Sequence, residues 1–340
     1  MAIFDGILKK KNTEKSAEKK IADGEALLQK YKEGKANLEQ RIVDEENAWR
    51  LQMWQKETNN TTPSSSAYMW NAVINKHADI MDNYPIPALL PREESDKEEA
   101  KMLSSIIPVI LERNDFEETY SNAAWYKLKH GTSCYGVFWN PKAENGTGDI
   151  LVNTIDLLRI FWDPTVYDVQ KSPNLFICAA VDNDVLKAQY PDKDIQGSKY
   201  NLTEYEKDDN VDRSKQSLVV DWYYKKSIGG KTIVHIIKYT GNTVLYSSEE
   251  DPKYANRGFY DHGMYPVVFD TLYPEADKIG GYGVISVTKD AQMYVDALDG
   301  LLMSYAKKAT TPRWFKKKDV GINEEEFADW SNPFVTVSGD

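Results

Sequence analysis

A long segment with an apolar stripe, from Gly280 to Trp314, limits the folds open to this chain more than any other feature of its sequence. A glycine-rich turn opens the segment, and apolar side chains then recur at alternating spacings of four and three residues. That pattern is typical of one helix packed on another. From Gly283 to Ala309 such a helix would be roughly 40 Å long, at about 1.5 Å per residue. The apolar seam consists of Val287, Ala291, Tyr294, Leu298, Leu301 and Tyr305, with Val284, Val295 and Leu302 in a second row.

Basic side chains gather where this predicted helix ends. Lys307 and Lys308 lie in its last turn, where cations interact favourably with the helix dipole. Further basic residues follow and are interleaved with Trp314 and Phe315. The cluster fits a contact with nucleic acid or an acidic partner, and it equally fits a solvated helix end followed by a lysine-protected edge strand. The complete basic cluster is Lys307, Lys308, Arg313, Lys316, Lys317 and Lys318.

The charge and the cysteine content exclude several classes of protein. The 340 residues include 42 basic and 53 acidic side chains, a formal net charge of -11, so any contact with DNA has to be local. Only Cys134 and Cys178 occur, and they form no Cys-x-x-Cys pair, which favours a reduced, cytosolic protein over a disulfide framework. No apolar run approaches the roughly 20 residues of a membrane-spanning helix, so we expect no membrane partner.

The first part of the chain has the pattern of helices. Residues 1–66 form a predicted helical arm, made of one helix or of two that are separated at Gly34. The start of the arm, Met1 to Lys20, is an apolar patch followed by lysines, which fits either an amphipathic membrane anchor or a frayed, solvated terminus. Further helices are predicted at residues 69–84, from Ser95 with a capping box completed by Glu98, and at residues 115–130.

From Ser133 the apolar period changes from about 3.6 to 2 residues, which indicates β-strands. Residues 133–139 and 149–155 are predicted to form a hairpin, and residues 159–162 and 175–181 to extend the same sheet. The sequence therefore predicts an α+β fold in which helices precede a mainly antiparallel sheet. The remaining predicted strands are 218–224, 232–239, 243–247, 265–272 and 334–337, with a turn at Gly241-Asn242.

No combination of residues satisfies the pattern of an active site. Gly281, Gly283 and Ser286 nearly match a dinucleotide-binding fingerprint, but no βαβ unit surrounds them, which favours a flexible turn before the helix. Ser133 and Cys134 lie near His130 without a Gly-x-Ser-x-Gly elbow, which favours packed side chains over a nucleophile. The histidines are scattered, so we expect no metal site and no cofactor, and the chain does not look like an enzyme.

Several short motifs recur in a characteristic order along the chain. They are the run from Asn75 to Asn83 before Pro85 and Pro87, WYKLKHGTSCYG from Trp125 to Gly136, Gly148-Asp149-Ile150 and Phe161-Trp162-Asp163-Pro164. Tyr282-Gly283, Gln292 in the long helix and the Thr311-Pro312 break follow. In this order the motifs resemble the N-terminal half of a tailed-bacteriophage portal protein, including its first stem helix and the start of its clip. The resemblance covers residues 69–340.

The resemblance implies an α+β, portal-like fold with a helical N-terminal region. Residues 67–278 would be the wing, with helices followed by antiparallel sheet, 279–311 the stem helix and 312–340 the start of a small α/β clip. The family implies a ring of about 12 subunits at the portal vertex of the virion capsid, assembled in the cytoplasm of the bacterial host. Double-stranded DNA is packaged and ejected through such a ring without sequence specificity. The implied partners are capsid proteins, the terminase large subunit and the head-tail connector.

Two groups of side chains would contact the channel or the partners of such a ring. Asp296 and Asp299, facing the channel, would repel phosphate and keep DNA from adhering. The basic cluster lies where members of the family meet the terminase or head-completion proteins. Family members continue past the clip into a second stem helix and further domains, so we expect a truncated chain with an uncovered seam.

Two other functions fit parts of the sequence. A different phage head-tail connector, or a DNA-binding assembly module, would share the long helix and the basic turn but would not carry so long a wing. A hydrolase would need Ser133, Cys134 and His130 to converge in a cleft.

Overall fold

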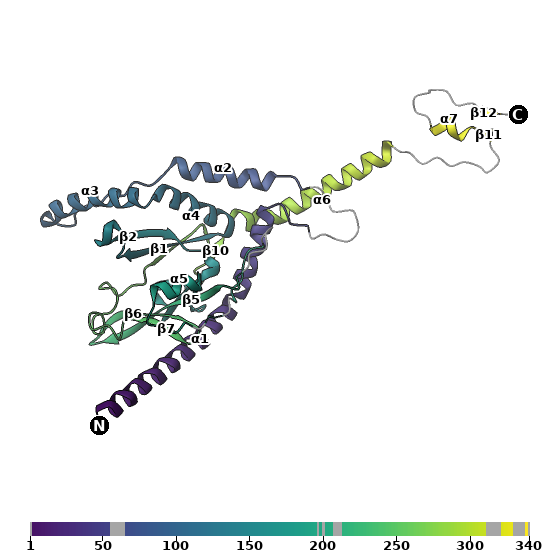
Figure 1. Cartoon of the computed structure of the whole chain (residues 1–340). Helices are drawn as coiled ribbons and strands as arrows, with labels where there is room; N and C mark the ends of the chain where they lie inside the picture. Colours follow the sequence, from purple (N-terminus) through teal and green to yellow (C-terminus); the bar gives the residue numbers. More distant parts are fainter. Residues whose placement is uncertain are drawn as a thin grey trace.

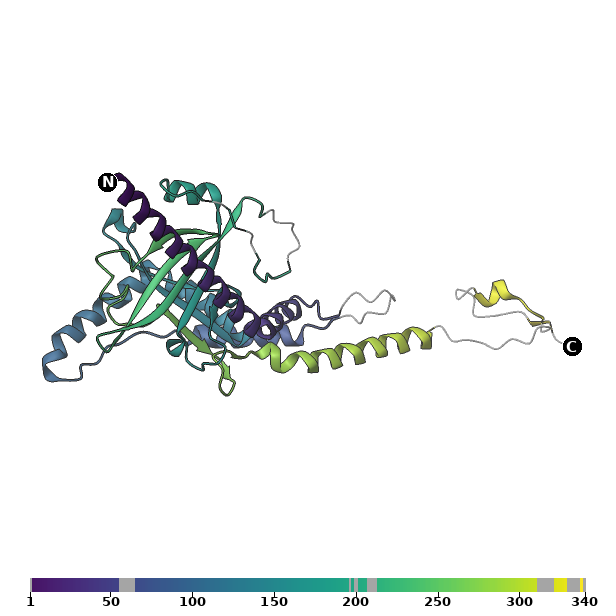
Figure 2. The same cartoon turned by 90° about the horizontal axis from the view of Figure 1, so that it is seen from below.

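The computed structural model describes residues 2–54, 65–195, 197–198, 201–206, 213–310, 321–328 and 337–338. Helices and antiparallel strands share the body, and one long helix extends from it (Figures 1 and 2), which confirms the predicted α+β class. The helices are α1 (Ala2–Trp49), α2 (Tyr68–Asp82), α3 (Lys97–Arg113), α4 (Phe116–His130), α5 (Asn183–Gln189), α6 (Val284–Thr310) and α7 (Glu324–Ala328).

The first helix, α1, packs along the body for much of its length. From Ile21 to Ala48 its buried positions recur at spacings of three and four residues, so one face is in contact throughout. The helix contributes to three separate hydrophobic cores and is part of the body rather than a separate arm. Of the two alternatives that the sequence leaves open, one helix or two separated at Gly34, the structure shows one continuous helix. A Cβ there would lie 2.6 Å from Cγ of Pro164, so glycine serves close packing at this position.

The predicted hairpin is confirmed and forms the centre of a small sheet. Strand β1 (Thr132–Asn140) pairs antiparallel with β2 (Asp149–Thr154), and Val137 lies opposite Val152. The other edge of β1 pairs with β8 (Val267–Thr271), which gives the order β2-β1-β8. The outer edge of β2 is covered by Asn114, whose amide donates to the Ile150 carbonyl and accepts from the Val152 amide. Asn114 therefore occupies part of the outer edge of β2, and β8 is the other edge strand of this sheet.

The next five strands along the chain form a second sheet. The prediction that residues 159–162 and 175–181 extend the first sheet is therefore wrong. The order of the second sheet follows the chain, and every pairing is antiparallel. The predicted turn at Gly241-Asn242 joins its last two strands. The strands are β3 (Ile160–Trp162), β4 (Asn174–Asp182), β5 (Gln216–Ile228), β6 (Lys231–Thr240) and β7 (Thr243–Ser247). Short pairs are β9 (Tyr273–Pro274) with β10 (Gly281–Tyr282), and β11 (Gly321–Ile322) with β12 (Val337–Ser338).

A helical core joins α1, α2, α4 and the start of α6. Ala48, Met69, Leu128 and Ile285 are all buried there, one from each of these helices. Beside them Trp49 stacks on Trp70 and contacts Trp125, with ring centroids 5.5 Å apart in both pairs. Four elements from distant parts of the sequence thus hold the base of α6 in place.

Helix α3 makes few contacts with this core. It follows a short 3-10 turn at Glu94–Asp96, and the predicted capping box is absent, because the Ser95 hydroxyl donates to the Asp96 carboxylate instead. Ala100 is the buried residue of the helix.

Candidate functional site at the long helix

Helix α6 has two faces with opposite environments. Val284, Ile285, Gln292 and Asp296 are buried against the body. The predicted seam lies on the other side, where Ala291 is also exposed and nothing in the same chain covers it among the residues described. The exposed fractions are 66% for Val287, 75% for Tyr294, 60% for Leu298, 66% for Leu301 and 73% for Tyr305. In the second row Leu302 is 65% exposed and Val295 36%, whereas Val284 is buried.

The buried face of α6 is fixed by one carboxylate. Asp296 is 0% exposed and accepts hydrogen bonds from the Ser66 amide at 2.9 Å and the Ser66 hydroxyl at 2.8 Å. Ser65 Oγ, Trp54 Nε1 and Gln292 Nε2 donate to it as well, at 3.0, 3.3 and 2.7 Å. Burial opposes ionisation, but the bonds from Ser66, Gln292 and Ser65 outweigh it and hold the pKa of Asp296 below its ordinary value. The carboxylate thereby ties two segments that flank residues 55–64 to the long helix.

The predicted channel and partner residues fall into three groups. Asp296 lies inside its own subunit, unlike the sequence-based placement at a channel wall, because Trp54, which follows α1, and Ser66, which precedes α2, pack over it. Asp299, Lys307 and Lys308 are exposed on α6. Arg313, Lys316, Lys317 and Lys318 lie outside the described residues.

The glycine turn before α6 is a place of close packing, not the flexible turn that the sequence suggests. A Cβ on Gly283 would lie 2.5 Å from the Lys129 carbonyl oxygen, and one on Gly281 would lie 2.2 Å from the Tyr273 carbonyl oxygen. Gly131, with φ of +80°, faces the same turn and ends α4. The end of α4 and the start of α6 can therefore pack this closely only because these positions carry no side chain.

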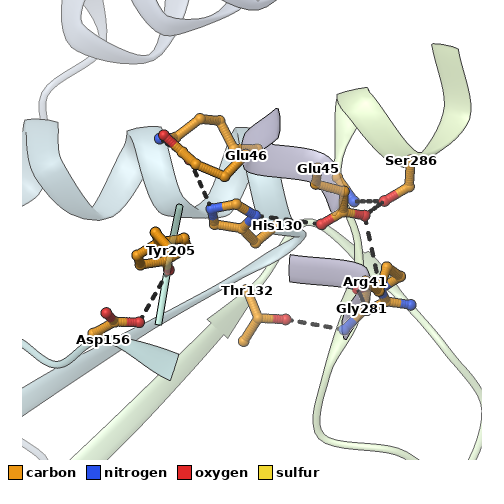
Figure 3. Close-up of polar contacts among 11 residues, drawn as sticks. Arg41, Glu45, Glu46, His130, Thr132, Asp156, Tyr205, Gly281 and Ser286 are labelled. Carbon is orange, nitrogen blue, oxygen red and sulfur yellow. Dashed lines mark hydrogen bonds and ion pairs between the residues drawn. The ribbon is translucent and has the colours of Figure 1, made fainter. Parts of the chain in front are cut away.

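Beside the crossing lies a cluster of buried and half-buried charged residues, which we call the junction cluster. Its members are Arg41, Glu45, Glu46 and His130, labelled in Figure 3, and Lys129. His130 is 0% exposed, and its Nδ1 lies 3.3 Å from Glu45 Oε2. Its Nε2 lies 3.3 Å from Glu46 Oε2, and Lys129 Nζ lies 2.6 Å from the same oxygen. The cluster joins α1 to α4 by opposite charges held away from water.

The junction cluster also reaches α6. Ser286 Oγ donates to Glu45, and Arg41 Nη2 donates to the Gly281 carbonyl at 2.6 Å (Figure 3). The sequence did not indicate this cluster, because its members come from two helices, α1 and α4, that are far apart in the chain. The one local signal is Glu45, a charged residue at a position where the spacing of α1 places its buried face.

Acid should weaken the junction cluster. Burial works against ionisation of Glu46, but hydrogen bonds from His130 and Lys129 and the Lys129 charge lower its pKa from 4.5 to about 2. Stability from a depressed carboxyl pKa is present above the unfolded value and is lost as pH falls through the folded one, here between 4.5 and about 2. We therefore expect Glu46→Gln to lower the free energy of unfolding at pH 7 and to do so much less at pH 3.

Urea unfolding of both proteins at the two pH values measures that difference. Glu112→Gln changes an exposed glutamate of α3 and is the matched control, which we expect to have little effect at either pH. A Glu46→Gln effect of equal size at pH 7 and pH 3 would contradict the role of the carboxylate charge.

The residues that suggested a nucleophile are enclosed. His130, Ser133 and Cys134 are 0%, 1% and 1% exposed, and the His130 ring lies between two carboxylates. Burial raises the pKa of the Cys134 thiol to about 12, so the reactive thiolate is strongly disfavoured at neutral pH. This geometry favours the packing interpretation over the hydrolase.

The described part of the chain is informative about metal ligands and about membrane-spanning helices. No group of three or more His, Cys, Asp or Glu side chains has the arrangement of a metal site among the described residues. Within the same residues, none of the helices has the length and apolar character needed to cross a membrane.

A helix with one buried face and one uncovered apolar face is typical of a subunit in a larger assembly. The chain matches the family of phage P22-like portal proteins over residues 71–329. Because this match spans more than half of the chain, the protein belongs to that family, and the predicted portal resemblance is confirmed. Portal proteins are structural components of tailed phages, so the family favours this role over an unrelated connector. A search of curated proteins found no match.

Proposed function

We propose that copies of this chain form a closed ring of about 12 subunits at a capsid vertex, through which double-stranded DNA is packaged and ejected. In this proposal residues 67–278 are the wing, 279–311 the stem helix and 312–340 the start of the clip, with α1 packed into the wing. The observation that carries the proposal is the uncovered seam of α6, together with membership of the portal family.

The seam supplies the surface that such a ring needs. Full burial of one large apolar side chain stabilises an interface by about 1.5–3 kcal/mol, and each seam contains several. In a ring every subunit offers the same two flanks to its neighbours, so every copy of α6 can be covered by another copy. The buried face, held by Asp296, fixes the direction in which the seam points.

The charges of the chain suit a conduit. A net charge of -11 disfavours adhesion of DNA, and Asp299 is an exposed carboxylate on the long helix that could line the channel. Lys307 and Lys308 lie at the end of α6 and, with the basic residues after it, would meet an acidic surface of the terminase large subunit or the head-tail connector. Capsid proteins would hold the outer parts of the ring.

Negative-stain images of the purified chain test this function. We expect closed particles with rotational symmetry and a central hole wide enough for duplex DNA. Open filaments, or particles without a hole, would contradict the proposal.

A further inference from the structure

The hairpin made by residues 84–91 and α3 is an apolar surface that the other described residues leave open. Leu89 is tied to Ser104 by two hydrogen bonds, which hold the extended segment against the helix. Most of the large side chains of both segments nonetheless face outward. The exposed fractions are 82% for Ile86, 85% for Leu90, 57% for Met102, 45% for Leu103, 43% for Ile106 and 46% for Val109. A patch of this kind on a folded subunit indicates a docking surface.

An acidic region adjoins the apolar one. Glu93 and Glu94 precede α3, Glu98 and Glu99 lie in its first turn, and all four are exposed. Between Arg92 and Lys101 five carboxylates outnumber three basic side chains, and Glu94 is paired with Lys97. The surface along α3 therefore changes from a net acidic start to an apolar part from Met102 to Val109. A complementary partner needs a helix that is apolar at one end and basic at the other.

The first residues of α1 have that composition in the reverse order. Ile3, Phe4, Ile7 and Leu8 are followed by Lys9, Lys10, Lys11, Lys15 and Lys19. The backbone is helical from Ala2, and this end of α1 runs out beyond the sheets (Figures 1 and 2). In both views it lies on the opposite side of the body from α3, so the two surfaces of one chain do not meet.

We propose that residues 2–19 of one copy lie antiparallel along α3 of the neighbouring copy. The spacing agrees, because Ile3 to Lys15 and Lys97 to Val109 each span about 18 Å of helix at 1.5 Å per residue. Antiparallel alignment places the apolar end of α1 on Met102 to Val109 and its lysines on the four glutamates. Two different patches on opposite flanks form a head-to-tail contact, the kind that closes into a ring. The contact rests on the proposed ring and adds a second interface to the seam of α6.

A cross-link between two preparations of the full chain tests the contact. One carries Ile7→Cys and the other Ile106→Cys, and the native cysteines do not interfere because both are buried. After mixing and mild oxidation we expect a disulfide-linked pair in several-fold higher yield than from Ile7→Cys with Tyr167→Cys. Tyr167 is 60% exposed and lies outside the hairpin, so it reports random collision. Equal yields from the two mixtures would overturn the contact.

Charge reversal gives an independent measurement in the same assay. Glu94→Lys with Glu98→Lys should lower the specific cross-link several-fold, as should Lys10→Glu with Lys11→Glu in the other preparation. Combining both reversals should restore the yield, which misfolding of either variant could not produce. A ring that forms in images without the specific cross-link would overturn this contact and leave the proposed function standing. A specific cross-link in a protein that forms no ring would support the contact and count against the proposed function.

Discussion

Replacing Leu298 and Leu301 together by aspartate is expected to turn the assembled protein into monomers. Both side chains lie on the seam of α6 and are 60% and 66% exposed in a single chain. Burying a charge in place of each would remove about 1.5–3 kcal/mol of apolar burial per side chain and add a desolvation cost. Sedimentation velocity at a fixed protein concentration measures the change.

The control for this variant is Asp290→Ala. Asp290 is exposed on the same helix but lies outside the seam, so the variant should sediment as the wild type does. Circular dichroism should show unchanged helix content in the double variant, because no described residue of the same chain covers the seam. Retention of the full assembly by the double variant would show that the seam is not the interface.

Asp296→Ala is expected to lower the free energy of unfolding by about 3 kcal/mol. The substitution leaves the Ser66 amide and the Gln292 side chain without their acceptor in a buried site. It also removes the acceptor of Trp54 Nε1 and Ser65 Oγ. The segment after α1 and the segment before α2 therefore lose their common attachment to α6. Urea unfolding measures the effect, at one protein concentration because assembly also stabilises the folded state.

Asp299→Ala removes the same chemical group from the same helix at an exposed position. We expect its free energy of unfolding to change by less than about 0.5 kcal/mol. Similar losses for Asp296→Ala and Asp299→Ala would show that the buried hydrogen bonds contribute little.

The sequence pattern was sufficient to predict the helices and strands whose periodicity or turn residues lie within the element itself. The long helix, predicted at 283–309, is observed as Val284–Thr310, and the hairpin strands agree within a residue or two at each end. Gly131 ends α4 as predicted, because a left-handed residue after a helix is a local requirement. In each case the periodicity or the turn residue is set by immediate neighbours.

Features that depend on contacts between residues far apart in the chain could not be predicted from the sequence. A glycine at position 34 suggests a helix break from the sequence alone, whereas in the structure it allows Pro164 to pack against the helix. The division into two sheets depends on β8 and Asn114, which occupy the edges of the hairpin. The capping box at Ser95 failed because the hydroxyl bonds to the adjacent Asp96.

The candidate site shows the same limit. The seam could be predicted as a stripe, but which face of α6 the body covers depends on packing with α1, α2 and α4. The portal resemblance implies a channel position for Asp296, as a carboxylate that would repel the phosphates of DNA. Its position four residues after Gln292, on the face of the buried Ile285, was the signal that could have identified it.

Thiol labelling of Leu298→Cys tests most directly whether the seam is the surface between subunits. Leu298 and Tyr167 are each 60% exposed in a single chain, so Tyr167→Cys is a matched reference. In the assembled protein we predict that Leu298→Cys reacts at least about tenfold more slowly than Tyr167→Cys, because a neighbouring α6 covers it. Equal labelling rates at the two positions in the assembled protein would contradict the account.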